Sequence, residues 1–346
     1  MIRLALKRLG EVNTVVFQPG KREAYDAEWN SENIKRITYT TIGPSITGLF
    51  QRNRIRNWFK AQFAIENYDL IVVCFVSTAA LLPRDVLRKV IIDADDLGKT
   101  FLTRQKLSSR LKTLALDGLA QIYGRQVGHV WYVNPADEPK ILTNNKSYLP
   151  NTIRFPDLKR QRKSPIPGRI LMVGLMEHEP NFFGATWFAL NVLPRLSNVM
   201  PVELHIVGRI SGERKAALEK NNIVVRGFVE NITSEYDSAA LVIAPIFSGG
   251  GTQIKVIDAL AHERPLVCTP FAHSGFADDL QNERDLLLAA RDVEDWVKAC
   301  AGVLLRPDDY LRMARHGRDS IARYSTENFE KTVTATVEML VKHGEA

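Results

Sequence analysis

Between Arg169 and Leu305, short apolar runs alternate with longer amphipathic stretches, and this alternation limits the possible folds of the chain. A short apolar run is typical of a buried strand, whereas an apolar face repeating every three to four residues is typical of a helix. Strands and helices in strict turn predict a parallel doubly wound sheet, whose ligands bind beyond the carboxyl ends of the strands. The predicted strands are Ile170–Val173, Glu203–Val207, Val224–Val225, Leu241–Ala244 and Pro265–Thr269, and the predicted helices are Asn181–Leu193, Gly212–Asn221, Glu230–Ala239, Thr252–His262 and Val293–Leu305. Asn181 is predicted to cap the first of these helices.

The first half of the chain shows the same two patterns less regularly. A basic, proline-containing run, Lys159–Gly168, predicts a linker between the two halves. A further helix is expected near the C-terminus, over Tyr324–His343. In the first half we expect strands at Asn13–Phe17, Tyr68–Val76, Val90–Ile92, His129–Val133 and near Tyr148, and helices over residues 2–9, about 50–66 and about 100–126.

A glycine-rich turn, Ser248–Thr252, follows the predicted strand Leu241–Ala244 and leads into a helix. Gly249, Gly250 and Gly251 lack a Cβ, so the backbone there can come close to a ligand. The first N–H groups of a helix and its positive dipole end attract anions, and this order of elements therefore indicates a phosphate site. The alternative is an ordinary tight turn with a helix cap.

Three side chains add to this hypothesis. Thr252 is predicted to cap the helix, and Lys255 lies one turn into it with a mobile positive charge. Asp258 follows Lys255 by three residues and so lies near the same side of the helix, where its carboxylate could accept hydrogen bonds from sugar hydroxyls.

Positive charge is concentrated in the first half of the chain. Of a net charge of +7, residues 1–150 hold 22 Lys and Arg against 14 Asp and Glu, and the remainder is close to neutral. An anionic membrane surface or a diphosphate-bearing acceptor fits this imbalance. Nucleic acid is not expected, because no nucleic-acid-binding module is present. The helix expected over about 50–66 interleaves aromatic residues with arginines and fits either a membrane interface or an ordinary surface helix.

The three cysteines and the N-terminus indicate the compartment. Cys74, Cys268 and Cys300 lie in or beside apolar runs without a metal-binding spacing, which predicts small buried side chains in a reducing environment. The first ten residues are interrupted by charges and do not resemble a signal peptide. We therefore expect a cytoplasmic protein, with peripheral contact at the inner face of the membrane left open.

The second half resembles family 4 of the glycosyltransferases, which are retaining enzymes of the GT-B fold. The matching segments are ILMVGLMEHEPNFFGATWFALNVLP, VELHIVGR, GFVENITSEYDSAALVIAPIFSGGGTQIKVIDALAHERPLVCT and RYSTENF, and LPNTI resembles the segment that precedes the second domain. The resemblance implies an α/β chain with two facing Rossmann-like domains with parallel sheets. It divides the chain into residues 1–152 with a crossing helix over about 326–346, on the acceptor side, and residues 153–325, which bind the nucleotide sugar.

The sequence departs from the family pattern at three places. Two Glu often flank a seven-residue gap at the glycine loop, and here those positions hold Gly250 and Asp258. The Arg and Lys common after the first strand of the second domain are absent from Gly174–His178, so the positive charge must come from Arg209, Lys255 or both. The chain opens in what looks like the first helix, so the first domain is expected to be shortened at its N-terminus.

From the resemblance and the residues together we expect a site without metal or resident cofactor, with a nucleotide-diphosphate sugar of UDP or GDP type as donor. Fixed N–H dipoles and cations would stabilise the leaving diphosphate. Asp93 and Asp95 end a strand of the first domain and are interpreted as cleft carboxylates, or alternatively as caps of the next helix. The candidate catalytic residues are Arg209, Lys255, Asp93 and Asp95, and the candidate substrate-binding residues are Gly174, Ser248, Gly249, Gly250, Gly251, Thr252, Asp258 and His273.

The preferred hypothesis is a retaining glycosyltransferase that moves a sugar to a glycan or polyprenyl-diphosphate-linked acceptor in bacterial surface polysaccharide synthesis. A nucleotide-sugar epimerase of the same fold and a degenerate, non-catalytic GT-B partner protein are the two alternatives.

Overall fold

The structure is a computed structural model. It describes residues 2, 6, 8–9, 14–19, 34–39, 68–74, 76–79, 82–94, 118, 121–159, 164–220, 222–249 and 252–344. The helix expected over about 50–66, most of the helix expected over about 100–126, and Asp95, Gly250 and Gly251 lie outside the described residues.

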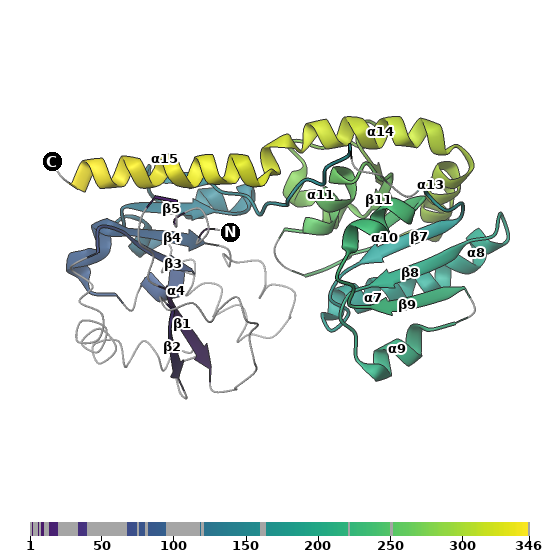
Figure 1. The fold of residues 1–346 in the computed structure, drawn as a ribbon, viewed down its shortest axis with the longest axis horizontal. Helices are drawn as coiled ribbons and strands as arrows, with labels where there is room; N and C mark the ends of the chain where they lie inside the picture. The colour runs from purple at the N-terminus through teal and green to yellow at the C-terminus, as the bar shows by residue number, and fades with distance from the viewer. Residues whose placement is uncertain are drawn as a thin grey trace. The chain divides into compact units, whose positions relative to one another are not determined.

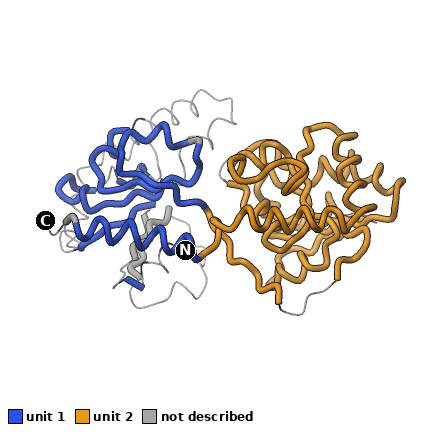
Figure 2. Tube along the Cα trace, turned by 90° about the horizontal axis from the view of Figure 1, so that it is seen from above, with its two compact units in different colours: residues 1–150, 327–346 blue, residues 151–326 orange. Residues whose placement is uncertain are grey.

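The chain forms two compact units (Figure 2). Unit 1 comprises residues 1–150 and 327–346, and unit 2 comprises residues 151–326. The C-terminal helix α15 (Thr326–Gly344) therefore belongs almost entirely to unit 1, although it follows unit 2 in the sequence. Each unit contains its own parallel sheet, as Figure 1 shows.

Unit 1 contains a parallel sheet in the order β3-β4-β5-β6, formed by Ile71–Cys74, Val90–Ala94, His129–Tyr132 and Lys146–Tyr148. The strands expected at Val90–Ile92 and His129–Val133 are confirmed, because their short apolar runs lie buried in the middle of this sheet. Two further strands, β1 (Thr14–Pro19) and β2 (Ile34–Tyr39), pair in parallel with each other. Short helical segments lie at α4 (Val76–Ala79), Arg84–Lys89 and Pro135–Lys140.

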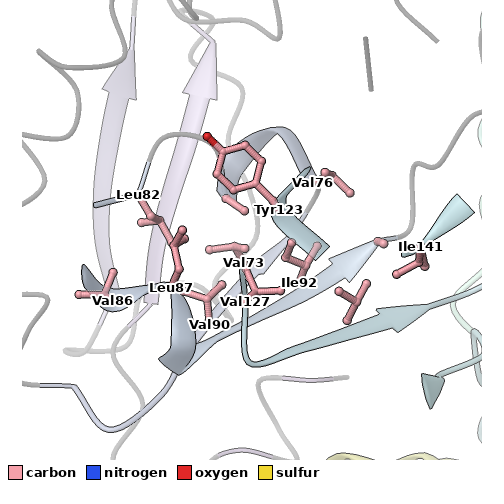
Figure 3. Packing of buried hydrophobic residues seen from close by; sticks show 13 residues of the cluster. Val73, Val76, Leu82, Val86, Leu87, Val90, Ile92, Tyr123, Val127 and Ile141 are labelled. Atoms are coloured by element: carbon pink, nitrogen blue, oxygen red, sulfur yellow. The ribbon is translucent and has the colours of Figure 1, made fainter. Parts of the chain in front are cut away.

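Apolar residues pack on both faces of this sheet. On one face, side chains from β3, β4 and β5 meet those of the segments that connect or follow these strands, including Leu87, Tyr123 and Ile141 (Figure 3). On the other face, Trp131 packs with α15, and its Nε1 donates a hydrogen bond to Thr336 Oγ1 at 3.2 Å. Burial of this aromatic side chain and satisfaction of its N–H hold α15 on unit 1.

Unit 2 contains a six-stranded sheet in which every neighbouring pair is parallel, in the order β12-β11-β10-β7-β8-β9. The predicted strands Glu203–Val207 and Leu241–Ala244 and the predicted helix Val293–Leu305 are confirmed with the same bounds. The strands are β7 (Arg169–Val173), β8 (Glu203–Val207), β9 (Ile223–Gly227), β10 (Leu241–Ala244), β11 (Leu266–Cys268) and β12 (Leu287–Leu288).

Helices follow most of these strands. The expected single helix over Asn181–Leu193 is divided into α7 (Glu179–Trp187), a π-helical segment (Phe188–Val192) and α8 (Leu193–Ser197). The helix α14 (Pro307–Ser320) was not predicted. The remaining helices are α9 (Gly212–Leu218), α10 (Ile232–Ser238), α11 (Ile254–Ala261), α12 (Pro270–His273) and α13 (Val293–Leu305).

The expectation that all three cysteines are buried was wrong for one of them. Cys268 and Cys300 are buried, whereas Cys74 is exposed at the end of β3. No helix among the described residues is long and apolar enough to cross a lipid bilayer.

His129 gives unit 1 a testable sensitivity to acid. Its ring is buried, Nε2 lies 2.8 Å from Ser147 Oγ, and Nδ1 is buried without a hydrogen-bond partner among the described residues. Burial lowers the pKa of His129 from 6.5 to about 4. The folded state therefore disfavours the protonated ring, and stability is lost as the pH falls below the unfolded-state pKa.

We expect unit 1 to lose about 2 kcal/mol of stability from this residue between pH 7 and pH 5, and His129→Gln to remove that loss. The loss of stability is measured by the hydrogen-exchange protection of the amides in Val90–Ala94 and His129–Tyr132 at pH 7 and pH 5. His178→Gln, which changes an exposed histidine of unit 2, is the matched control. Equal pH dependence in the parent and His129→Gln would contradict the assignment.

Candidate functional site

The sheet of unit 2 has a topological switch point between β7 and β10. From β7 the chain continues through β8 to β9 on one side, and through β10 to β11 and β12 on the other. In open parallel sheets, ligands bind beyond the carboxyl ends of the strands at such a point. The segments that leave β7, β8 and β10 there are Gly174–Leu175, Gly208–Arg209 and Pro245–Gly249.

The loops after β7 and β8 touch through their backbones. Gly208 has a φ of +139°, and a Cβ at this position would lie only 1.9 Å from the Gly174 carbonyl oxygen. The Gly174 amide donates to Val207 O at 2.9 Å, and the Met176 amide donates to Arg209 O at 2.9 Å. These contacts fix the backbone of Gly174 and place Arg209 at the same edge of the sheet.

The Arg209 side chain is exposed, and among the described residues no carboxylate forms an ion pair with it. An unpaired guanidinium keeps all its donors available for an anion.

The glycine-rich loop lies against the start of α7. Gly249 has a φ of +130°, and a Cβ there would lie 3.3 Å from Pro180 Cγ and 3.9 Å from His178 Cε1. Ser248, the residue before it, is exposed. The backbone conformation at position 249 therefore favours glycine, and Pro180 leaves little room for a side chain.

Thr252 does not cap α11, contrary to the sequence prediction. The N-cap residue is Gln253, and its side chain accepts no capping hydrogen bond. Thr252 precedes it, and its Oγ1 is buried without a partner among the described residues. The first turn of α11 therefore keeps N–H groups that no side-chain cap satisfies, as an anion-binding helix start requires.

Lys255 is held by two side-chain oxygens. Its Nζ donates to Asn181 Oδ1 at 2.8 Å and to Gln253 Oε1 at 3.1 Å. Burial lowers the pKa of Lys255 from 10.5 to about 8. The side chain is thus mostly charged at pH 7, but it is less mobile than the sequence suggested.

Asn181 was predicted to cap the following helix, and this prediction was wrong. The N-cap residue of α7 is His178, and Asn181 lies inside the first turn. Its Nδ2 donates to Leu175 O at 2.9 Å, while its Oδ1 accepts from Lys255. Sequence reasoning missed this role because an Asn near a helix start is usually a cap.

Asp258 lies one turn after Lys255 and is half-buried. Burial raises the pKa of Asp258 from 3.8 to about 6, and the neighbouring Tyr236 hydroxyl offsets part of that effect. Tyr236 is itself buried and stacks on His262 with ring centroids 4.3 Å apart. Neither aromatic neighbour was identified from the sequence.

Two other candidate residues are described. His273 ends α12, in a segment that reaches the glycine-rich loop, because a Cβ on Gly275 would lie 3.4 Å from Thr252 Cγ2. The His273 ring is buried, and its Nε2 donates to Leu280 O at 2.7 Å. Asp93 belongs to β4 of unit 1, where Cys74 Sγ lies 3.9 Å from its Oδ2. No group of three or more metal-ligating side chains occurs in the described part of the chain. The structure thus gathers Gly174, Arg209, Ser248, Gly249, Thr252 and Lys255 at one edge of unit 2, with Asp258 one turn further along α11.

Solved structures define the class of fold. The chain is similar to sucrose-phosphate synthase from Thermosynechococcus elongatus, with a TM-score of 0.70 and 16% identity over 99% of this chain and 92% of that one. A glycosyltransferase from Rickettsia africae gives a TM-score of 0.66 with 13% identity over 99% and 93%. Anabaena HepE in complex with UDP and glucose gives 0.62 with 12% identity over 88% and 86%. The chain therefore has the GT-B fold of glycosyltransferases.

One family model matches part of the sequence. Residues 167–306, which lie within unit 2, match the family model described as glycosyl transferases group 1. No curated protein sequence matches the chain significantly.

The contact between the loops after β7 and β8 can be tested with one substitution. Gly208→Ala would place a Cβ against the Gly174 carbonyl in a backbone conformation that L-residues avoid. We expect a loss of about 2–4 kcal/mol of unfolding free energy. Gly212→Ala is the matched control, because a Cβ there meets nothing within 4 Å. Chemical denaturation compares the two variants, and equal stabilities would contradict the proposed contact.

Proposed function

We propose that this chain is a retaining glycosyltransferase that transfers a sugar from a nucleotide-diphosphate donor to a glycan or lipid-linked acceptor. The observation that carries the proposal is the arrangement at the switch point of unit 2. There, Gly249 lies against Pro180 at the start of α7, and the uncapped first turn of α11 carries the half-buried cation of Lys255, which binds Asn181 of α7.

Sugar transfer requires stabilisation of the leaving diphosphate as its negative charge grows. Backbone N–H groups and fixed cations do this effectively when they are oriented before the reaction. We assign the amides between Ser248 and Thr252, together with Lys255 and Arg209, to the diphosphate. Asp258 accepts hydrogen bonds from the ribose hydroxyls, and the Gly174 backbone borders the donor.

The other two groups of candidates receive different roles. His273 is left out of the site, because its ring is buried and its Nε2 is bound to Leu280 O. In unit 1, Asp93 and Asp95 are proposed to act on the acceptor hydroxyl or the donor sugar as acid/base groups.

The donor and acceptor classes have separate support. A donor of UDP or GDP type is supported by the similar fold of Anabaena HepE, whose structure holds UDP and glucose. An acceptor carrying phosphate, such as a polyprenyl-diphosphate-linked glycan at the inner face of the membrane, fits the excess positive charge of residues 1–150. We propose on this basis that the enzyme acts in the cytoplasm, in bacterial surface polysaccharide synthesis.

Donor binding is the first test. We expect UDP- or GDP-sugars at millimolar concentration to raise the melting temperature, and Arg209→Ala to weaken donor binding about tenfold through loss of a charge-assisted contact. Arg315→Ala, at an exposed arginine of α14, is the matched control. If UDP-, GDP- and ADP-sugars all leave the melting temperature unchanged, the donor site is absent.

Product analysis separates the proposed transferase from the alternatives. A retaining transferase releases free nucleotide only with an acceptor present and gives a product with the donor's anomeric configuration, which NMR reads directly. An epimerase would change the sugar without an acceptor, and a non-catalytic partner protein would bind the donor without turnover.

The shifted pKa values predict a maximum in donor affinity between about pH 6 and pH 8. Below about pH 6 Asp258 becomes protonated and loses acceptor strength, and above about pH 8 Lys255 loses its charge. Calorimetric titration with UDP from pH 5 to pH 9.5 measures both limbs. We expect Asp258→Asn to remove most of the fall in affinity at low pH, and Lys255→Met to remove most of the fall at high pH. If a variant keeps the fall that its residue should cause, the role given to that residue is wrong.

A further inference from the structure

The Lys255 ammonium has one hydrogen-bond donor to spare. An ammonium carries three N–H donors. Among the described residues, Asn181 Oδ1 and Gln253 Oε1 are its two acceptors, at 2.8 Å and 3.1 Å. A third N–H therefore remains for a ligand at the switch point.

The hydrogen-bond partners of Asn181 allow only one orientation of its side-chain amide. Leu175 O can only accept a hydrogen bond and the Lys255 ammonium can only donate one, so Nδ2 must face the former and Oδ1 the latter. The side chain is buried and packs on Gly174, where a Cβ would lie 3.0 Å from Asn181 Cγ. Asn181 is thus tied to the backbone of the loop after β7 and cannot follow Lys255 if the lysine moves.

Gln253 is held less firmly than Asn181, because its side chain has no second hydrogen-bond partner among the described residues. It lies two residues before Lys255, and among the described residues the ammonium is the one hydrogen-bond partner of its side chain. The contact is also the longer of the two. A phosphate oxygen would accept from an ammonium more strongly than a neutral amide does.

We propose that Asn181 is a positioning residue that holds the Lys255 ammonium at the switch point, and that Gln253 is the acceptor which the donor's diphosphate replaces. This inference rests on the proposed function and adds to it the residue that aims the cation. Asn181 itself need not touch the donor.

The charged groups around Lys255 do not supply this function. On α7, Glu179 is paired with Arg214 of α9 at 2.8 Å. On α14, Arg318 contacts the far end of α11 through Ala261 O, and His316 pairs with Asp285. The other titratable groups that the structure describes on this side of unit 2 include His178 before α7, Arg209 after β8, Asp258 of α11 and Tyr236 of α10.

The test measures how the affinity for UDP, or for GDP if only GDP binds, changes from pH 6 to pH 9.5. Asn181→Leu removes an acceptor from the ammonium. We expect about tenfold weaker binding at pH 7. The affinity also falls at high pH, and we expect the midpoint of that fall to lie about one pH unit below its value in the parent. Asn181→Asp keeps an acceptor and adds a negative charge, so its midpoint should move above that of the parent.

Opposite shifts of the midpoint are the signature of positioning. A merely structural role would weaken binding in both variants and leave the midpoint where it is, and that result would overturn the proposal. Asn191→Leu is the matched control, because Asn191 is exposed and binds only the Trp187 carbonyl at 2.8 Å. It should change neither affinity nor midpoint.

A second measurement separates this inference from the proposed function. In ligand-free protein, NMR titration of labelled lysine, with the Lys255 signal assigned through Lys255→Arg, reports the Asn181 contact directly. Failure of every nucleotide to bind the parent protein removes the proposed function. Nucleotide binding with an unchanged Lys255 titration in both Asn181 variants removes only the positioning role.

Discussion

The close approach of two backbones at the carboxyl edge of unit 2 is the constraint on which the site depends. The loops leaving β7 and β8 are in contact only because Gly208 has no side chain where the Gly174 carbonyl lies. Hydrogen bonds on both sides of this contact hold Gly174 and Arg209 in place. A rigid edge of this kind can present backbone groups and a cation to a ligand without reorganising when the ligand binds.

Lys255 shows how a side chain can keep its positive charge at a partly buried position. Burial alone favours the neutral amine, which is why the pKa of Lys255 falls to about 8. Two neutral amide oxygens compensate in part without removing the positive charge, whereas a carboxylate partner would cancel it. The arrangement therefore leaves a net positive charge in the first turn of α11, where the anionic donor that we propose would bind.

Much of the architecture could be predicted because strong local patterns agree with the tertiary fold. The runs Glu203–Val207 and Leu241–Ala244 are short and mostly apolar, as strands are, and both form interior strands of the sheet. The helix α14 was missed because Pro307–Ser320 is rich in charged residues and only Met313, Ala314 and Gly317 are buried, so few apolar residues mark its inner face. The caps predicted at Thr252 and Asn181 failed because residue type indicates a cap without showing what else the side chain can reach.

The order of strands and helices, the parallel sheet and the glycine-rich turn before a helix follow from local sequence patterns, since each depends on residues close together in the chain. The contact of Asn181 with Lys255, 74 residues later, does not. Nor do the shifted pKa values of Lys255 and Asp258, or the packing of α15 on Trp131. Hydrogen-bond partners and burial arise only when distant segments pack together, so the tertiary structure alone decides which groups at the site are charged, held or free.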